Sequence, residues 1–279
     1  MATLYVVATP IGNLEDLSRR AERVLGEVAH VAAEDTRRTG LLLQHLGIRA
    51  DLVSYHAHNE AARLEGILAW LAAGEDVALV SDAGTPVVSD PGGRLVQAAA
   101  AAGHVVVPIP GPSAVLAALV SSGLPCDRFA FLGFVPRKGG DRSSTLARIA
   151  GSLETCVVFE SPERLGRLLE DLVRACGPDR RAAVGRELTK LHEEIRRGTV
   201  EELHAYYQRE KPRGEVTVVV GAGSGESEQV EVETVRRRAR ILLRSGERPS
   251  EVARDLARSL GVSRNEAYAM VQELKGEPD

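Results

Sequence analysis

Residues 78–94 read ALVSDAGTPVVSDPGGR, and this stretch decides how the first half of the chain is organised. It begins as an apolar strand and then holds two aspartates, two prolines and three glycines. Glycine and proline at this density interrupt regular structure, so the strand is predicted to end in a polar loop. Such a loop is either a long turn or a ligand-binding segment, and the surrounding sequence has to separate the two.

Short apolar runs alternate with amphipathic segments on both sides of this stretch. The predicted strands are 4–8, 28–33, 52–55, 77–80, 105–109, 129–134, 155–159, 182–184 and 216–220. The predicted helices include 60–73, 144–153, 162–175 and 199–208. Strands that are apolar along their length and alternate with helices are typical of α/β domains with largely parallel sheets. About 220 residues of this pattern exceed one usual domain, so we expect two α/β domains, at 1–112 and 113–223.

The remainder, 224–279, is predicted to be a linker followed by a small helical module. The glycine-rich run 221–228 leads into acidic residues, which favours a linker over a phosphate-binding loop. Residues 236–264 hold nine arginines against three acids. Residues 249–274 have a helix–turn–helix pattern, in which Gly261 ends the first helix and Ser263 caps the second.

Two interpretations of this module stay open. It is either a helical bundle that docks for stability or a clamp for nucleic acid. Its apolar positions, Val252, Leu256 and Leu260 in the first helix, suit both. We favour the clamp, because arginine guanidinium groups suit bidentate contacts with phosphate.

The overall composition gives weaker information. The chain has 279 residues, 44% of them hydrophobic, and a net charge of −4, so any nucleic-acid surface has to be local. No apolar run approaches the roughly 20 residues of a membrane span. The first residues lack the basic region of a signal peptide, and the three cysteines never stand in a C-x-x-C spacing. We therefore expect a cytoplasmic protein without a disulfide framework.

Three polar loops follow strands in the first half of the chain. They read TPIGNLEDLS at 9–18, AEDTRRTG at 33–40 and SDAGTPVVSDPG at 81–92. In open α/β sheets, ligands bind outside the carboxyl ends of the strands. A simple connection needs only about 2–6 residues, so three long loops at one edge predict a binding site rather than three turns.

These loops, together with VVPIPGPSAVLAAL at 106–119, FLGFVPRKGGDR at 131–142 and GRELTKLHEE at 185–194, resemble the tetrapyrrole-methylase superfamily. The resemblance runs from residue 4 to about 221. The EDTRRT loop, and SDAGTP where precorrin-methylating members have a Gly-Asp-Pro loop, are similar to the branch that 2′-O-methylates a cytidine of 16S rRNA. The resemblance implies that a cofactor, S-adenosylmethionine, is held in a cleft between two α/β domains. It also implies that a small helical module follows these domains in the chain.

The resemblance also implies which residues contact the cofactor. On the side of the first domain these are Pro10, Asp82, Ala83, Gly84, Thr85, Ser113 and Ala114. On the side of the second domain they are Phe159, Gly185, Gly214 and Glu215.

The chemistry of three of these residues agrees with that role. Gly84 lets backbone approach a ligand, and the Asp82 carboxylate balances an ammonium or sulfonium charge. Ser113 at a helix start offers a hydroxyl and free backbone N–H groups. The alternative for Asp82 is a turn residue that bonds its own backbone.

A general base would assist attack by a ribose hydroxyl. Glu34, Asp35 and Glu187 are the candidates, and Asp35 is our first choice. Each has an alternative as one half of an ion pair at the rim, which we favour for Glu34.

The expected RNA contacts are basic residues in the same loops, in the loop 136–142 and in the helical module. They are Arg37, Arg38, Arg137, Lys138, Arg186, Lys190, Arg236, Arg237, Arg238 and Arg264. His56 and His58 lack a third ligand in register, so we expect no metal.

Three functions remain open at this point. The first is methylation of 16S rRNA, with the small ribosomal subunit as substrate and a homodimer as the expected assembly. The second is methylation of a small tetrapyrrole-like molecule, which would have little use for the arginine-rich module. The third is a non-catalytic RNA-binding protein, against which the intact SDAGTP and PGPSA segments argue.

Overall fold

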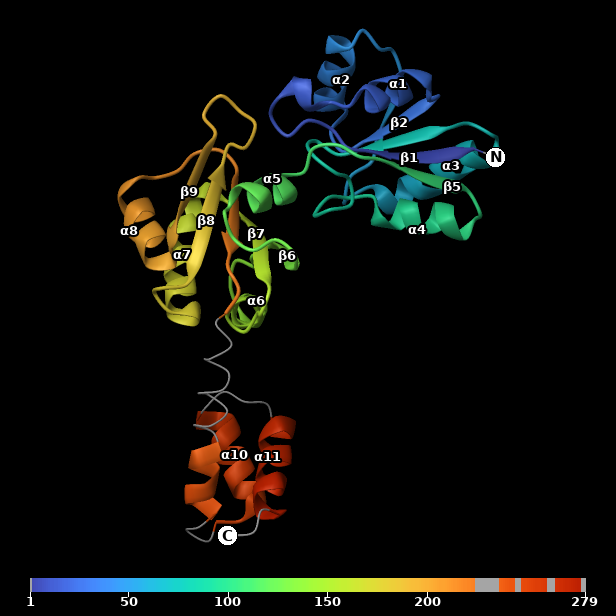
Figure 1. Ribbon diagram of the computed structural model, residues 1–279. Helices are drawn as coiled ribbons and strands as arrows, with labels where there is room; N and C mark the ends of the chain where they lie inside the picture. Colours follow the sequence, from blue (N-terminus) through green and yellow to red (C-terminus); the bar gives the residue numbers. More distant parts are fainter. Residues whose placement is uncertain (1, 224–235, 244–246, 260–263, 277–279) are drawn as a thin grey trace. The chain divides into compact units, whose positions relative to one another are not determined.

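The structure is a computed structural model that describes residues 2–223, 236–243, 247–259 and 264–276. The chain divides into two compact units, Met1–Ala222 and Gly223–Asp279. The first unit contains two five-stranded sheets and the helices that cover them (Figure 1). The two α/β parts and the helical module agree with the fold expected from the sequence, while the domain limits 1–112, 113–223 and 224–279 remain our proposal.

The first sheet is entirely parallel, as predicted. Its strand order is β3-β2-β4-β1-β5. The strands are β1 (Thr3–Val7), β2 (His30–Ala33), β3 (Asp51–Ser54), β4 (Val77–Val80) and β5 (Val105–Ile109). The helices are α1 (Arg19–Glu27), α2 (Thr36–His45), α3 (Glu60–Ala72) and α4 (Gly93–Ala101), with the short helix η1 (Leu14–Asp16) before α1.

Both faces of this sheet are buried, which explains its uniformly apolar strands. Helices α1 and α2 cover one face, where Leu25 and Leu43 pack on Val31 and Val80. Helices α3 and α4 cover the other face, where Leu71 and the residues around it pack on alternate strand positions. Because every strand is parallel, the loops after β1, β2 and β4 leave the same edge of the sheet.

The second sheet differs from the prediction. Its order is β6-β7-β10-β8-β9, and only the β6–β7 pair is parallel. The strands are β6 (Phe129–Phe134), β7 (Thr155–Glu160), β8 (Arg181–Arg186), β9 (Glu194–Thr199) and β10 (Val216–Val220). The expectation of a largely parallel sheet is therefore wrong here, because β8 and β9 form a hairpin and β10 returns between β7 and β8. Strand β9, EIRRGT, was not predicted, since its charged residues hide the apolar alternation.

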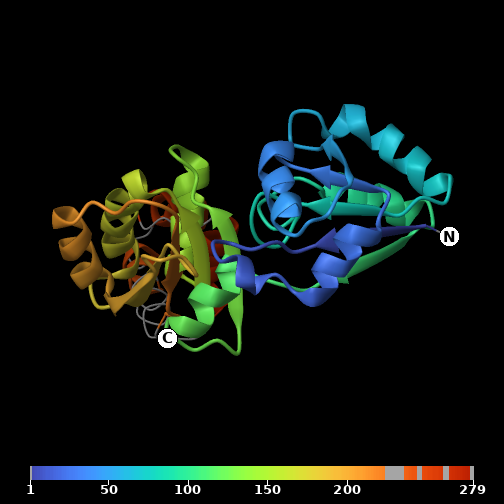
Figure 2. The same cartoon turned by 90° about the horizontal axis from the view of Figure 1, so that it is seen from above.

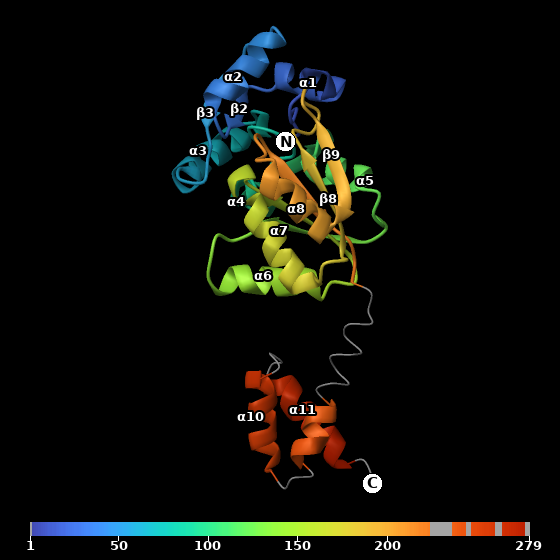
Figure 3. The ribbon, with the colours of Figure 1, turned by 90° about the vertical axis from the view of Figure 1, so that its left-hand side faces the viewer.

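The two faces of the second sheet have different partners. Helices α6 (Gly140–Ala150), α7 (Pro162–Cys176) and α8 (Val200–Arg209) cover one face with the largest core cluster (Figure 3). Helix α5 (Ala114–Ser121) covers the other face, together with Ile11 from the first half of the chain. Figure 2 shows the blue segment after β1 reaching toward the second sheet. The junction of the two sheets is therefore an apolar core in its own right.

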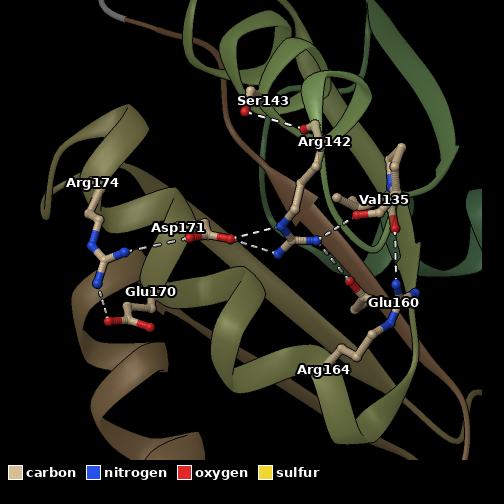
Figure 4. A network of polar contacts seen from close by, with 10 residues as sticks. Val135, Arg142, Ser143, Glu160, Arg164, Glu170, Asp171 and Arg174 are labelled. Carbon is tan, nitrogen blue, oxygen red and sulfur yellow. Dashed lines mark hydrogen bonds and ion pairs between the residues drawn. The ribbon is translucent and has the colours of Figure 1, made fainter.

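A buried ionic network holds the start of α6 against α7 (Figure 4). The Arg142 guanidinium donates to Asp171 Oδ2 at 2.7 and 2.9 Å and to the carbonyl of Pro136 at 2.9 Å. The Glu160 carboxylate is paired with Arg164 and lies 3.9 Å from Arg142 Nη1. These bonds fix both ends of the loop 136–139, which is shorter than predicted because α6 already begins at Gly140.

The second unit is a helical bundle in the residues that the structure describes. It consists of a helix over 236–243, α10 (Pro249–Ser259) and α11 (Arg264–Gly276). Val252 and Leu256 are buried with Ala267 and Val271, which confirms those inward positions. The predicted positions Leu260, Gly261 and Ser263, and most of the linker, lie outside the described residues.

Each strand predicted from the sequence is present, with ends shifted by at most two residues. Helix α3 begins directly after Asn59, as its pattern indicated. Among the helices that the structure describes, none has the length and apolarity needed to cross a membrane.

Candidate functional site

The loops after β1 and β4 are joined by a small piece of antiparallel ladder. Thr9 N donates to the carbonyl of Gly84 at 2.9 Å, and Gly84 N donates to the carbonyl of Thr9 at 3.0 Å. Thr9 Oγ1 also donates to the carbonyl of Ser81 at 3.2 Å. The SDAGTP segment is therefore held against the chain beside Pro10, as the proposed site requires.

The loop after β2 joins this pair through carboxylates. Asp82 Oδ1 accepts a hydrogen bond from Asp35 N at 3.0 Å, and Glu34 Oε2 accepts one from Asp82 N at 3.3 Å. Arg38 Nη1 lies 3.5 Å from Asp82 Oδ2. The structure thus brings the three polar loops together at one edge of the first sheet, because the loop after β4 bonds the loop after β1 through Gly84 and the loop after β2 through Asp82.

Asp35 has a different environment from the one a general base needs. It caps α2 by accepting from Arg37 N at 2.9 Å, and it accepts two further bonds from the Arg37 guanidinium, at 3.0 and 2.6 Å. These bonds hold the pKa of the Asp35 carboxyl well below its usual range. A carboxylate stabilised in this way is a weak proton acceptor, so our first choice of base is not favoured by the geometry.

Gly84 and Thr85 connect this edge to the start of α5. Gly84 has φ +83°, and a Cβ there would lie 3.3 Å from Ile11 Cγ2, so a larger residue would be strained. Thr85 Oγ1 donates to the carbonyl of Pro112 at 3.2 Å. The next residue, Ser113, is the N-cap of α5 and accepts from Leu116 N.

The expected contributions of the second half lie around the same junction. Ala83 and Ala114 pack with Phe159 against the core that joins the two sheets. Gly185 is buried on β8, and a Cβ there would lie 3.2 Å from a methyl group of Leu188. Most of the expected cofactor contacts therefore converge on this junction, although they were selected from separate loops.

Glu187 binds its own neighbourhood rather than standing free. Glu187 Oε1 accepts from Lys190 Nζ at 2.8 Å and from Glu215 N at 2.9 Å, with Gly214 directly beneath the carboxylate. These bonds lower the pKa of Glu187. Lys190 also lies over Gly12, where any side chain would collide with it. The Lys190 side chain thus packs on the loop after β1, while Glu187 holds it to the second half of the chain.

Four non-glycine residues with positive φ flank the site. Val87 (+75°) and Ser89 (+68°) belong to the loop after β4, and Glu187 (+51°) and Thr189 (+65°) belong to the loop after β8. Positive φ is strained for a β-branched side chain and persists only where the surroundings enforce it. Both loops are thus held in specific conformations.

Asp90 is a functional candidate that the sequence analysis missed, although it stands in the SDPG part of the opening stretch. Its pKa is raised to about 6, chiefly by burial and to a smaller extent by the nearby carboxylates of Glu34 and Asp82, while a hydrogen bond with Ser81 opposes the shift. A carboxyl group with this pKa exchanges protons near neutral pH. The sequence feature that could have pointed to Asp90 is that it is a second aspartate in the loop 81–92, directly before Pro91 and Gly92.

A pocket opens beside Asp82 on the side of α2. Its volume is about 240 Å³, and Ser81 and Asp82 form part of its wall. The other lining residues are Thr9, Pro10, Leu14, Arg38, Thr39, Leu41, Leu42 and His45. It lies at the carboxyl ends of β1 and β4, where ligands bind in sheets of this kind.

The expected RNA contacts fall into two groups. Arg37, Arg38, Arg186 and Lys190 are each paired with a carboxylate of the site. Within the described part of the chain, Arg137 and Lys138 are exposed and have no ion pair, so their charges are available to an anion.

In the helical unit, the arginines of the first helix differ from one another. Arg236 is paired with Glu273 at 3.1 Å, and Arg238 lies 3.9 Å from Asp255. Arg237 is exposed. Arg264 begins α11, and its side chain lies outside the described part.

The histidines of the loop after β3 form a turn. His56 N donates to Asn59 Oδ1 at 2.8 Å, and His56 Nδ1 accepts from His58 N at 3.2 Å. Across the residues that the structure covers, no group of three or more histidine, cysteine, aspartate or glutamate side chains is placed to hold a metal ion.

Comparison with known proteins identifies this arrangement. Residues 3–204 match the family of tetrapyrrole (corrin/porphyrin) methylases, which is well over half of the chain. The chain belongs to the tetrapyrrole methylase family. It is therefore a methyltransferase, and the fold expected from its six sequence segments is confirmed.

Similarity to named relatives extends over nearly the whole chain. The ribosomal RNA small subunit methyltransferase I of Synechocystis sp. is 44% identical over 99% of this chain and 100% of its own length. The protein of the same name from Thermotoga maritima is 46% identical over 79% of this chain and 98% of its own length. A solved tetrapyrrole methylase, uroporphyrin-III C-methyltransferase from Thermus thermophilus complexed with S-adenosyl homocysteine, has a TM-score of 0.55. It is 23% identical and covers 80% of this chain and 98% of its own, so it supports the fold alone.

Proposed function

We propose that this methyltransferase transfers a methyl group from S-adenosylmethionine to the 2′-hydroxyl of a cytidine in 16S rRNA. The observation that carries the proposal is the full-length similarity to proteins named ribosomal RNA small subunit methyltransferase I. The arginine-rich unit also supports an RNA substrate, because a small tetrapyrrole would make no use of it.

The residues at the junction suit this cofactor. The Asp82 carboxylate stands directly before the loop 83–85, which Gly84 joins to Thr9 with a backbone φ of +83°. The start of α5 at Ser113 and Ala114 provides N–H groups that suit the carboxylate of an amino acid. Phe159, which is partly buried, offers an apolar surface to a flat ring. A charged group, hydrogen-bonding groups and an apolar surface that suit S-adenosylmethionine therefore come from neighbouring parts of this junction.

The protein's own part in the reaction is to align and deprotonate the acceptor. The cofactor, when bound, supplies a methyl group that is already activated by the sulfonium charge. The acceptor hydroxyl has to lie in line with it, which the fixed conformations of the loops at 81–92 and 187–190 favour. The hydroxyl proton then needs an acceptor with a pKa near the working pH.

Asp90 is the proton acceptor that we propose, in place of Asp35. Asp35 is held as a weak base by Arg37, whereas burial raises the pKa of Asp90 to about 6. Glu34 and Glu187 then keep structural roles, since each accepts a hydrogen bond from a backbone N–H group of the site. The exposed Arg137 and Lys138 are left to bind RNA phosphates.

The finer aspects of the substrate are part of the same proposal. The acceptor is the assembled small subunit, because a chain with few aromatic residues has few platforms for stacking single-stranded bases. The Thermotoga relative aligns over 220 residues that form nearly its whole length, so we propose that the helical unit adds RNA affinity to a complete catalytic unit. A homodimer in the cytoplasm is what the resemblance implies, and we keep it as a proposal.

The decisive experiment is calorimetric titration with S-adenosylmethionine followed by transfer of labelled methyl to small ribosomal subunits. We expect binding, and label in a dinucleotide that resists alkaline hydrolysis, because a methylated 2′-hydroxyl cannot attack the adjacent phosphate. Binding without label in rRNA would overturn the RNA substrate and favour a small-molecule acceptor. Absence of binding would overturn the proposed cofactor site.

A further inference from the structure

The pocket beside Asp82 has a wall that the cofactor site does not explain. Arg38, Leu41, Leu42 and His45 stand on α2 at positions i, i+3, i+4 and i+7, so they form one face of that helix. The core face of α2 is a different one and includes Leu43. A second face that combines leucines with ionisable groups lines a cavity instead of the core.

Two of the leucines that line the pocket are exposed. Leu41 on α2 is 68% exposed, and Leu14 in the loop after β1 is 48% exposed. Large exposed apolar side chains grouped around a pocket are typical of a ligand-binding surface. Polar groups of Thr9, Asp82 and His45 complete the lining.

A pyrimidine base fits the chemistry of the pocket. It has two flat apolar faces, which leucine side chains can contact, and an edge of donors and acceptors, which Asp82, Thr9 and His45 can meet. The volume of about 240 Å³ leaves room for a pyrimidine ring with its substituents. Arg38 adds a guanidinium plane on which a base can stack.

The position of the pocket is also suitable. Ser81 and Asp82 line it, and the next residues in the chain, Ala83 and Gly84, reach the junction where we place the cofactor. A base held in the pocket would therefore keep its own ribose close to the methyl donor. Enzymes that do chemistry on a base take it out of its stack, and the same rearrangement would let a base enter this pocket.

We propose that this pocket receives the base of the nucleotide whose ribose is methylated, with that base turned out of the RNA stack. The inference rests on the proposed function. It assigns Leu41 and Leu42 to contact with the base faces and Arg38 to its stacking. Specificity for one nucleotide then comes from the pocket and the shape of the RNA together.

The test compares Leu41→Ala with Leu153→Ala. Leu153 is a matched control, because it is 63% exposed and lies in the turn before β7, away from the pocket. We expect Leu41→Ala to lower kcat/KM for small subunits by roughly tenfold, since lost apolar contact in a binding pocket has about this effect. The affinity for S-adenosylmethionine and the thermal unfolding temperature are expected to equal those of the wild type. Leu153→Ala is expected to change none of these quantities.

A direct probe completes the test. In the presence of S-adenosyl homocysteine, cytidine 5′-monophosphate is expected to show saturation transfer in ligand-observed NMR with the wild type and Leu153→Ala, and much less with Leu41→Ala. Wild-type kcat/KM in Leu41→Ala would overturn the inference while the proposed function stands. Weaker S-adenosylmethionine binding in Leu41→Ala would overturn it too, because the pocket would then belong to the cofactor. If the wild-type protein labels no RNA, the proposed function itself fails.

Discussion

Two clusters of charged residues in this protein have similar composition and opposite environments. The network of Arg142, Glu160 and Asp171 is enclosed between α6, α7 and the second sheet, and the Glu160 side chain is 0% exposed. The cluster around Asp82 lies among loops at the edge of the first sheet, where the Arg37 side chain is 88% exposed.

The difference lies in whether a ligand can reach the charges. In the buried network the Arg142 guanidinium has two carboxylates and a carbonyl around it, so little is left to bind a ligand. In the loop cluster, Glu34, Asp82 and Asp90 are close together, and burial leaves Asp90 with a raised pKa. The enclosed charges fix the fold, even though Glu160 Oε2 is buried without a hydrogen-bond partner, whereas the charges at a sheet edge are within reach of a ligand.

The largest effect is expected for Arg142→Ala. Removing this guanidinium leaves Glu160 and Asp171 in a buried site with less compensation, which costs about 3–5 kcal/mol of the free energy of unfolding. Urea denaturation followed by circular dichroism measures this loss. Arg174→Ala is the control, because Arg174 is exposed and its pair with Glu170 is worth about 0–1 kcal/mol. Equal stabilities for the two variants would contradict the distinction between the clusters.

An intermediate effect is expected for Asp90→Asn, which removes the proposed proton acceptor. The methylation rate is expected to fall by about 100-fold, the lower range for general-base catalysis. The wild-type rate should rise as pH increases through about 6, the pKa of Asp90, and the variant should lose this dependence. Rates measured between pH 5 and 8 at saturating substrate test this, and an unchanged pH profile would exclude Asp90 as the base.

The same substitution has a consequence for stability. Because the folded-state pKa of Asp90 is raised, its contribution to stability is present below the unfolded pKa and is lost as pH rises through about 6. Relative to Asp90→Asn, the wild type should therefore lose on the order of 1 kcal/mol of unfolding free energy between pH 4 and 7, after allowance for solvent screening. Urea unfolding at both pH values measures this difference.

The smallest effect is expected for Asp82→Asn. An asparagine keeps an oxygen that accepts from Asp35 N, so the loops should stay together while the charge is lost. The affinity for S-adenosylmethionine is expected to fall by about tenfold, the effect of one charge-assisted contact. Calorimetry with S-adenosyl homocysteine sharpens the result, because that molecule lacks the sulfonium charge. A loss for both ligands places Asp82 near the ammonium group, and a loss for S-adenosylmethionine alone places it near the sulfonium. Unchanged affinity for both would reduce Asp82 to a scaffold residue.

The sequence by itself determined much of this protein. Apolar periodicity located every predicted strand, because a strand buried on both faces leaves an unbroken run such as Val77–Val80. The composition of the segment 81–92 indicated a binding loop, and the resemblance carried by six segments gave the fold. Strand β9 was not predicted, because it lies in a hairpin at the edge of the sheet and its charged residues do not form an apolar run.

Only the tertiary structure decided the roles of the individual charges. Asp35 and Asp90 are both aspartates in polar loops, and although Arg37 stands two residues after Asp35, the sequence does not show that its guanidinium bonds that carboxylate. In the folded chain Arg37 stabilises the charge of one, while burial beside two other carboxylates disfavours the charge of the other. The pocket wall on α2 was hidden for the same reason, since a leucine pattern does not say whether it faces a core or a cavity. A residue's chemistry depends on its neighbours in space, and these are fixed only when distant loops meet.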